Sequence, residues 1–552
     1  MINMTYKEFI EQVQTRLNNF SLKDLRLVIL EWATKLPPAK RKEFLRKLIL
    51  PQNIIINDSE GVNEHILEEL TLFADQVKDG EFYEGYGWDY EIEDERVFGD
   101  ESWVEEVETF FIEANEAFRN GNYELATKIY EVLFSLLSDH AENLPAQYDA
   151  EDMIKTDLNE ARSCYLRVTY LSSSPHERCE RMLNVVKNIQ FDIGKSVNLQ
   201  AMINADMEPI PDFNDFLLSW IELLKKHDEP HFKFLLREAV KLSGGIKAIA
   251  EFAQEEGATH PEAFIEWIEE LEQEKNYQQM INAAEKGLEK VTGIHAILRA
   301  KIAEALAKAG KYVNNLEIQL RGWQEAFYSD PSLSRLLSLL TIADQKDIYQ
   351  EEIEIAINKI KTVMVSDNLR AQLHLLAGNY QAAYNLCKNK KALGWTYGSN
   401  PKILVIPFFL KYLAKREKKN SGVNLLWKWA LQNTCGYRYG SDDMLERYQQ
   451  AMEDIFETIH LTPKEEKKYL EWCIKETGDR IEAIVGNQYR NSYHKAAKLL
   501  IATAETLIIQ GKKSVGLDLY FKYQQRYSRH RRFQQEVKSA LSSSHWLKNS
   551  LY

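Results

Sequence analysis

Two almost identical hexapeptides, far apart in the chain, constrain the fold more than any other feature of the sequence. They are Gly121-Asn122-Tyr123-Glu124-Leu125-Ala126 and Gly378-Asn379-Tyr380-Gln381-Ala382-Ala383. Each follows one apolar helical run and opens another. Glycine ends the first helix, tyrosine fills the space between two helices, and alanine lets their backbones approach closely. The hexapeptide is therefore the turn of a helical hairpin, and its recurrence indicates a helical-repeat protein.

The chain from Trp103 almost to its end follows the same pattern. Apolar residues recur at helical spacing, and turn residues such as Gly244-Gly245 and Gly310 separate the runs. The first hairpin carries the second-helix pattern of a tetratricopeptide repeat at Tyr123, Ala126, Tyr130 and Leu133. Almost no segment alternates with a two-residue period. We therefore predict an all-α fold with almost no sheet, an α-solenoid of tetratricopeptide-like helical hairpins.

A small helical module precedes this array. Residues 5–49 contain three amphipathic runs, and Ser21 with Asp24 resembles a helix start. A DNA-binding helix-turn-helix is conceivable here, but no recognition-helix pattern stands out. The sequence predicts five segments: an N-terminal helical module (1–50), a linker, helix and acidic aromatic strap (51–102), a first helical-repeat segment (103–205), a central helical-repeat segment (206–434), and a C-terminal helical segment with a basic cap (435–552).

The stretch from Asp79 to Glu101 has the most unusual composition in the chain. Ten acidic residues stand against one base, Arg96, and glycines interrupt any helix. Six aromatic residues accompany them: Phe82, Tyr83, Tyr86, Trp88, Tyr90 and Phe98. The simpler interpretation is an acidic strap whose rings pack onto neighbouring helices. The alternative is a partner-binding segment that docks rings while its charges meet a basic surface. The candidate contacts are Tyr83, Tyr86, Trp88 and Tyr90. The order of the acids does not fit an EF-hand.

A second unusual composition lies near the C-terminus. From Lys512 to Lys548 nine basic residues, interleaved with aromatic ones, stand against two acidic residues. Such a surface can hold phosphates and stack bases, so it offers four candidate contacts: Arg526, Arg529, Arg531 and Arg532. Another interpretation is a terminal capping pair of helices whose rings pack inward. A third is a homodimer in which this basic end receives the acidic strap of a second copy.

No pattern in the sequence points to catalysis. There is no P-loop, Gly-x-Gly-x-x-Gly, Gly-x-Ser-x-Gly or His-Glu-x-x-His motif. His227 and His231 have the i, i+4 spacing of metal ligands, but Pro230 interrupts the helix, which favours a capping loop. Five scattered cysteines are typical of buried thiols in a reducing compartment. We expect a non-enzymatic protein without metal or cofactor.

Charge and hydropathy bear on partners and location. A net charge of −14 argues against a generic nucleic-acid coat. Glu8 and Glu11 stand where a signal peptide needs an apolar core, and no apolar run reaches the length of about 18 residues that a membrane span needs. We expect a cytoplasmic protein that does not associate with membranes.

Packing motifs over residues 100–541 carry a resemblance to a known family. In the central part they are Pro211-Asp212-Phe213, Leu235-Leu236-Arg237-Glu238-Ala239-Val240, His260-Pro261, Arg299-Ala300-Lys301-Ile302-Ala303-Glu304 and Gly394-Trp395. In the C-terminal part they are Tyr493-His494-Lys495-Ala496-Ala497 and Arg526-Tyr527-Ser528-Arg529-His530-Arg531. The chain resembles uncharacterised bacterial tetratricopeptide-like helical-repeat proteins, some of which are associated with SWIM zinc-finger proteins. The resemblance implies a fold and no reaction, and the Cys/His cluster of a SWIM finger is absent from this sequence.

These observations converge on binding rather than catalysis. Helical arrays present long surfaces that suit peptides and proteins. We expect a scaffold or adaptor for a protein partner, and the resemblance implies a bacterial multi-protein system with a defence or regulatory role. The alternative is a nucleic-acid-associated factor that uses the basic C-terminal face.

Overall fold

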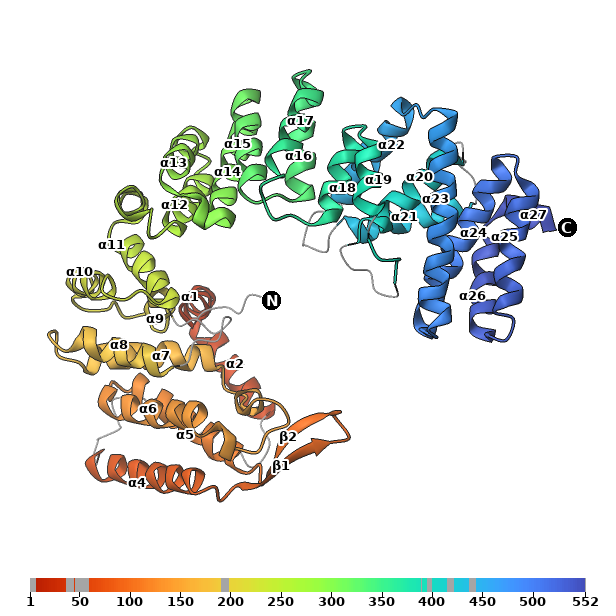
Figure 1. Ribbon diagram of the computed structural model, residues 1–552. Coiled ribbons are helices and arrows are strands. Elements are labelled where there is room, and N and C mark those ends of the chain that lie inside the picture. Colours follow the sequence, from red (N-terminus) through yellow and green to blue (C-terminus); the bar gives the residue numbers. More distant parts are fainter. Residues whose placement is uncertain are drawn as a thin grey trace. The chain divides into compact units, whose positions relative to one another are not determined.

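The computed structural model describes residues 6–35, 44, 59–189, 198–388, 390–394, 400–414, 421–435 and 443–551 (Figure 1). Most of the predicted third N-terminal helix, most of the linker after it, and the aromatic loops at 395–399 and 436–440 lie outside these residues. Within them helices dominate and the sheet is limited to two strands, so the predicted all-α solenoid is confirmed. Tertiary contacts divide the chain into two compact units, Met1–Ile249 and Ala250–Tyr552. The finer division into five segments stays a prediction.

The first unit combines helices with one β-hairpin. Its elements are α1 (Tyr6–Leu17), α2 (Leu22–Lys35), α4 (Ser59–Lys78), β1 (Tyr83–Asp89), β2 (Asp94–Gly99), α5 (Trp103–Arg119), α6 (Tyr123–Asp139), α7 (Leu158–Ser172), α8 (Arg178–Asn188), α9 (Leu199–Asn204), α10 (Phe213–Leu224) and the greater part of α11 (Pro230–Glu256). Helices α5 to α8 lie side by side in sequence order, and α4 packs on α6 (Figure 1). In the predicted first hairpin, α5 and α6, Tyr130 and Leu133 are fully buried.

The described part of the second unit is helical throughout. After the end of α11 it contains α12 (Glu262–Gln273), α13 (Tyr277–Lys290), α14 (Ala296–Tyr312), α15 (Leu316–Ser329), α16 (Leu333–Gln345), α17 (Tyr349–Lys359), α18 (Asp367–Leu376), α19 (Tyr380–Lys388), α20 (Lys402–Leu413), α21 (Gly422–Thr434), α22 (Asp443–Thr458), α23 (Pro463–Ile481), α24 (Tyr493–Ile509), α25 (Lys513–Arg526), α26 (Arg531–Ser542) and α27 (His545–Leu551). Helix α20 is buried on almost every side, which explains why its sequence is apolar without a polar face.

One backbone turn recurs between these helices. In each of these turns, a residue with positive φ follows the end of the first helix of the pair. These residues are Gly121, Lys275, Asn314, Asp347, Gly378 and Gly511. The following N–H donates to a carbonyl oxygen five residues earlier, as from Asn122 to Ala117 at 2.9 Å. This bond is the mark of a Schellman motif. The turns predicted at Gly121 and Gly378 are confirmed, and a tyrosine opens the helix after four of the six: Tyr123, Tyr277, Tyr349 and Tyr380.

The predicted turn at Gly310 is wrong. Gly310 lies inside α14, and the turn comes at Asn314 with φ 53°. Packing explains this glycine, because an added Cβ would lie 2.9 Å from the backbone nitrogen of Gln319 on α15. On the facing helix, a Cβ at Gly322 would lie 2.5 Å from the backbone nitrogen of Ala307. Helices α14 and α15 therefore pack backbone against backbone.

Two other local predictions agree with the structure. Ser21 and Asp24 cap the start of α2 reciprocally, with Ser21 N donating to Asp24 Oδ2 at 2.9 Å and Asp24 N donating to Ser21 Oγ at 3.3 Å. The double glycine interrupts α11, since Gly245 has φ 59° and leaves the helical conformation.

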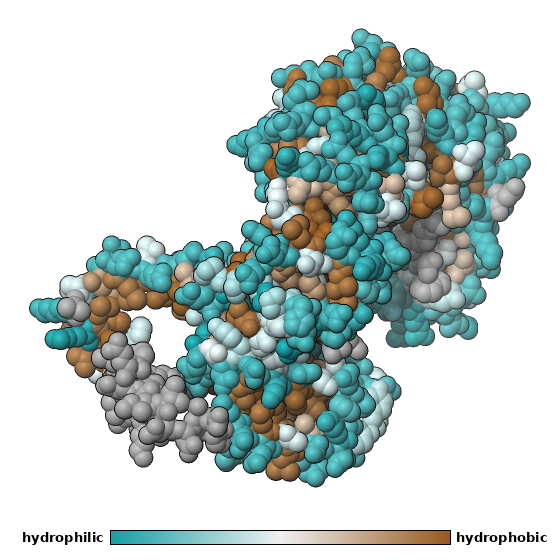
Figure 2. Space-filling model, turned by 90° about the vertical axis from the view of Figure 1, so that its left-hand side faces the viewer, coloured by the Kyte–Doolittle hydropathy of each residue, from teal (hydrophilic) through white to brown (hydrophobic). Residues whose placement is uncertain are grey.

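The N-terminal module differs from the rest of the chain in its burial. Helices form at the first two of the three predicted amphipathic runs, yet no described side chain of α1 or α2 is fully buried. The Tyr6 ring of α1 contacts the guanidinium of Arg119 on α5, whose Cζ atom lies 3.6 Å from the ring centroid. Figure 2 shows mainly hydrophilic side chains on one side of the molecule, with apolar groups gathered in smaller patches. No helix among the described residues is both long and apolar enough to cross a membrane.

Candidate functional site

The segment predicted to be an acidic strap is a β-hairpin. Strand β1 pairs antiparallel with β2, so that Tyr86 lies opposite Val97 and Trp88 lies opposite Glu95. Aromatic residues and valine favour extended backbone, and their cross-strand pairs stabilise a sheet. Residues 90–93 connect the strands, with Glu93 at φ 55°. Three of the glycines that exclude a helix, Gly85, Gly87 and Gly99, therefore belong to the strands.

The base of the hairpin is fixed to the helices. Phe82 is buried and packs edge-on against Phe73 of α4, with 5.9 Å between ring centroids. At Gly99, with φ 156°, an added Cβ would lie 1.9 Å from the carbonyl oxygen of Phe82, so no other residue fits. On its other side β2 forms a bridge from Val97 to Ala146. Strand β2 is thus flanked on both edges, whereas in the described chain only β2 pairs with β1.

The aromatic rings of the hairpin do not pack onto the helices as the strap interpretation expected. Phe82 is buried and Phe98 is half-buried, but the four candidate contacts are exposed: Tyr83 by 43%, Tyr86 by 63%, Trp88 by 51% and Tyr90 by 87%. The strap interpretation is therefore wrong for these four. Tyr86 and Trp88 alternate with glycines along β1 and so share one face of the hairpin.

The electrostatics of the hairpin are strongly negative. One base against ten acids gives residues 79–101 a formal charge of −9. That base, Arg96, is engaged locally: it lies 3.6 Å from Asp89, is paired with Glu101, and covers the ring of Phe98. On the aromatic face, Tyr86 Oη donates to Glu95 Oε2 at 2.6 Å, and this hydrogen bond raises the pKa of Tyr86. The arginine therefore leaves most of the carboxylates to face solvent.

The structure places the predicted arginines in the second unit, around the connection between α25 and α26. All four are exposed; Arg526 donates to Glu482 Oε2 at 2.9 Å and Arg532 to Asn491 Oδ1 at 3.1 Å. The neighbouring rings are buried, however: Tyr520, Tyr523, Tyr527 and Phe533. These four rings pack inward, as the capping interpretation predicted, whereas Phe521 and Trp546 are exposed, by 45% and 42%. The stacking surface expected for a nucleic-acid site is not formed by these rings.

His227 and His231 both contact an aromatic ring. Both imidazoles lie against the same ring, Phe232, with centroids 4.9 Å and 3.9 Å away; His227 is in the loop before α11, and His231 and Phe232 are in its first turn. The predicted capping loop at Pro230 is confirmed, because α11 begins there. In the ranges that the structure describes, no group of three or more His, Cys, Asp and Glu side chains could hold a metal ion.

The cysteine thiols are mostly withdrawn from solvent. Cys164, Cys387 and Cys473 are buried, and Cys179 and Cys435 are half-buried. Burial raises the pKa of Cys164 and of Cys387 to about 12, and raises that of Cys473 as well. A thiol with such a pKa stays protonated at neutral pH and is a poor nucleophile.

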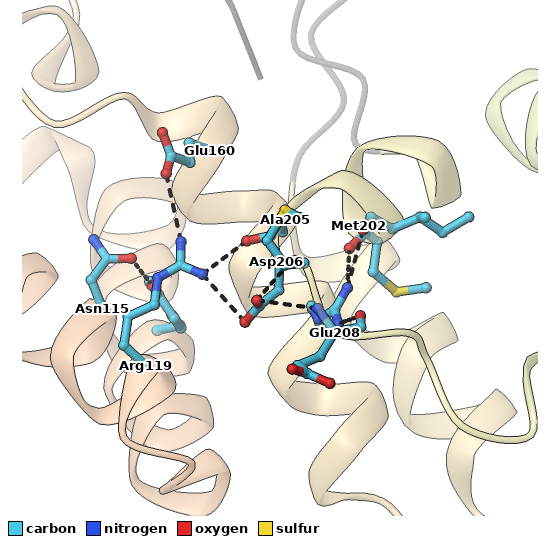
Figure 3. Close-up of polar contacts among 11 residues, drawn as sticks. Asn115, Arg119, Glu160, Met202, Ala205, Asp206 and Glu208 are labelled. Carbon is cyan, nitrogen blue, oxygen red and sulfur yellow. Dashed lines mark hydrogen bonds and ion pairs between the residues drawn. The ribbon is translucent and has the colours of Figure 1, made fainter. Parts of the chain in front are cut away.

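A partly buried polar cluster, which no local sequence pattern predicted, joins α5 and α7 to the segment around α9 (Figure 3). Arg119 donates to the carbonyl oxygen of Ala205 at 3.0 Å and to Asp206 Oδ2 at 3.4 Å. Arg167 donates to the carbonyl oxygens of Met202 at 3.3 Å and Ile203 at 3.1 Å, and also to that of Glu208. Because these bonds satisfy main-chain groups of the same unit, the cluster is structural.

Replacing Arg167 by methionine should lower the free energy of unfolding by about 3 kcal/mol, because three carbonyl oxygens lose their donor inside the protein. Urea denaturation followed by circular dichroism measures the change. The control is Arg181→Met on α8, an exposed arginine, which should change stability by less than about 0.5 kcal/mol. Equal effects of the two substitutions would refute a clamping role for Arg167.

A cleft of about 620 Å³ lies in the second unit, beside α20, α21, α22 and the end of α26. Its lining includes Lys411, Lys428 and Glu453. Lys411 donates to Asn424 Oδ1, and Trp427 Nε1 donates to Glu453 Oε1 at 3.2 Å. These lining groups bind one another, and their mixed charge does not single out a class of ligand.

Comparison with known proteins supplies no family, because no protein-family model and no curated protein matches the chain. Among solved structures the chain is similar to a "Circular tandem repeat protein with novel repeat topology and enhanced subunit contact surfaces". The match has 13% sequence identity and a TM-score of 0.16, and it covers 89% of this chain and 96% of that chain. The class is defined by the helices described above: this is an all-α helical-repeat protein, and its most distinctive surface element is the acidic aromatic hairpin.

Proposed function

We propose that the protein is a non-enzymatic scaffold or adaptor that binds a protein partner through the hairpin of residues 83–99. The observation that carries this proposal is the exposure of Tyr83, Tyr86, Trp88 and Tyr90 on an element whose base is fixed. Tyrosine and tryptophan are the residues most often found at the energetic centre of protein interfaces. Rigid presentation favours binding, since little conformational entropy is lost when the partner docks.

The charge of the hairpin supports a basic partner. A formal charge of −9 over residues 79–101 attracts a basic surface and raises the rate of encounter. The exposed arginines on and between α25 and α26 support two alternative ligands, a nucleic acid and a second copy of the chain. The burial of the neighbouring rings weighs against the nucleic-acid alternative, because base stacking needs exposed rings.

The cellular setting of the proposal has two sources. The sequence resemblance supports a bacterial system of several proteins, with a defence or regulatory role, and the scattered cysteines support a cytoplasmic location. Within such a system, the chain would hold a partner in position while another chain performs any zinc or DNA chemistry.

A pull-down with the tagged full-length chain from an extract of the source cells, quantified by mass spectrometry, tests the proposal. Tyr86→Ser/Trp88→Ser should reduce recovery of the partner by about tenfold or more, because it removes two anchoring rings. Phe521→Ser is the matched control, an exposed ring outside the hairpin that should leave recovery unchanged.

The charge-reversal variant Arg529→Glu/Arg531→Glu/Arg532→Glu examines the other surface. A partner or nucleic acid lost with this variant, and retained by Tyr86→Ser/Trp88→Ser, would assign binding to the C-terminal unit and reject the proposal. Circular dichroism of each variant confirms that its helices remain folded.

A further inference from the structure

The outer edge of β1, which pairs with no strand in the described part of the chain, points to a specific mode of binding: we infer that an extended basic segment of the partner adds to β1 as a third strand of the hairpin sheet. This inference rests on the proposed function and specifies the partner that the hairpin takes. In strand addition, main-chain hydrogen bonds provide affinity. Side-chain contacts on each face of the sheet provide specificity.

The two edges of the hairpin differ. β2 has β1 on one side and the bridge to Ala146 on the other, whereas no strand or bridge covers the outer edge of β1 among the described residues. In an antiparallel pair, alternate residues of an edge strand direct N–H and C=O groups away from their partner. Proteins usually blunt such an edge with lysine, proline or a bulge. The sequence of β1 (YEGYGWD) has no lysine or proline, and its one irregularity lies at the base, between Tyr83 and Gly85.

Close packing within the described chain does not require either of the two glycines of β1, although Gly85 borders the irregularity at the base of the strand. Neither Gly85 nor Gly87 has positive φ. A Cβ at Gly85 would meet nothing within 4 Å, and a Cβ at Gly87 would only touch Phe98 at an ordinary 3.9 Å. Glycine inside a strand costs stability and often marks a place where another backbone approaches closely. An added strand beside β1 supplies that neighbour, and its side chains can cover the face of the sheet that Gly85 and Gly87 leave without side chains.

Charge decides which strand is added. Glu84 and Asp89 lie on β1, and Glu91 and Glu93 lie in the loop that follows it. Two copies of this edge would bring like charges together, which is unfavourable. The arginines of a second copy lie on and between helices, whose backbone groups are already paired and cannot extend a sheet. A separate partner with an extended basic segment therefore fits this edge best.

The aromatic face adds a side-chain preference. Tyr86 and Trp88 stand two residues apart on one face of β1, and alternate residues of an added strand would lie beside them. An arginine or lysine beside an exposed indole or phenol makes a cation–π contact. The partner segment should therefore carry basic residues at every second position.

Fluorescence anisotropy with the full-length chain tests strand addition. The probe is a fluorescein-labelled octapeptide of alternating arginine and threonine, and the charge control is the same peptide with glutamate in place of arginine. Two further probes carry N-methyl groups on either the odd or the even residues. N-methylation removes the amide donors along one edge of the peptide without changing its charge.

We expect N-methylation to weaken binding at only one of the two sets of residues, odd or even. One N-methylated peptide should bind at least about tenfold more weakly than the unmodified peptide, while the other stays within about threefold. The glutamate peptide should not bind, and Glu84→Gln/Glu91→Gln should weaken the arginine peptide by about threefold or more. Equal binding by both N-methylated peptides, or no binding by the arginine peptide, would overturn strand addition.

The two proposals can fail separately. If Tyr86→Ser/Trp88→Ser abolishes the pull-down but both N-methylated peptides bind equally, the hairpin is a partner site and the strand-addition inference is wrong. If only one of the two N-methylated peptides loses affinity but Tyr86→Ser/Trp88→Ser leaves the pull-down unchanged, the edge accepts a strand. The proposed scaffold role through the hairpin is then wrong.

Discussion

Replacing Lys402 by methionine should lower the free energy of unfolding by about 3–5 kcal/mol. Its ammonium Nζ lies 2.8 Å and 2.7 Å from the two carboxylate oxygens of Glu476. Both side chains are only 3% exposed. Without the lysine, a carboxylate stays buried with Trp472 Nε1, at 3.1 Å, as its remaining side-chain donor. Chemical denaturation followed by circular dichroism measures the loss.

A matched control lies on α23, the helix that carries Glu476. Lys467 and Glu471 form an i, i+4 pair on α23 at 3.9 Å, and their side chains are 73% and 65% exposed. Lys467→Met should change stability by less than about 0.5 kcal/mol, because solvent screens an exposed pair. The double variant Lys402→Met/Glu476→Met should recover much of the loss, since neither charge is then left alone. A loss from Lys402→Met no larger than that from Lys467→Met would contradict this account of the buried pair.

Gly322→Ala should destabilise the protein by about 2 kcal/mol, although alanine is the better helix former by about 1 kcal/mol. The added Cβ would lie 2.5 Å from the nitrogen and 2.8 Å from the Cα of Ala307. Both atoms belong to the backbone of α14, so no side-chain rotation relieves the overlap. Helices α14 and α15 would have to move apart, and thermal denaturation would show a lower midpoint.

Gly293→Ala is the control for the glycine in α15. A Cβ at Gly293 would meet no atom within 4 Å, and this glycine does not have positive φ. The substitution should therefore leave the midpoint unchanged or raise it slightly, through the lower entropy of the unfolded chain. A midpoint that falls equally for both variants would show that the contact between α14 and α15 is not what requires glycine.

The helical turns illustrate what a sequence can reveal. Gly121 and Gly378 were predictable because glycine enters the left-handed region without strain, and the asparagine and tyrosine after it mark a new helix. Lys275, Asn314 and Asp347 adopt the same conformation in the same turn, yet none is a glycine. The same main-chain hydrogen bond closes the turn at each of them, and because that bond needs no particular side chain, the local sequence carried only a weak signal.

The hairpin shows the opposite difficulty. Gly85-Tyr86-Gly87-Trp88 does alternate with a two-residue period, which could have indicated a strand. The abundance of glycine and acid pointed instead to an irregular strap, because both residue types are depleted in strands. Pairing of β1 with β2 overrides that preference. The exposure of the rings depends on how the base is anchored at Phe82 and Gly99, which no local pattern encodes.

Long-range polar contacts were the least accessible to sequence reasoning. Arg167 binds main-chain carbonyl oxygens between residues 202 and 208. Lys402 of α20 pairs with Glu476 of α23, which follows 74 residues later in the chain. An arginine or lysine within an apolar helix gives no sign of which distant group it will meet. Burial and pairing become visible only after the helices are placed.

The recurrent Schellman turn has a consequence for how such a chain can change over evolution. Its joints are made by main-chain hydrogen bonds, and four residue types — glycine, lysine, asparagine and aspartate — occupy the left-handed position. A joint with so loose a sequence requirement survives most substitutions. A gene encoding this chain can therefore gain or lose a hairpin by duplication or deletion without inventing a new connection, so that the length of the array and the element it presents can evolve independently.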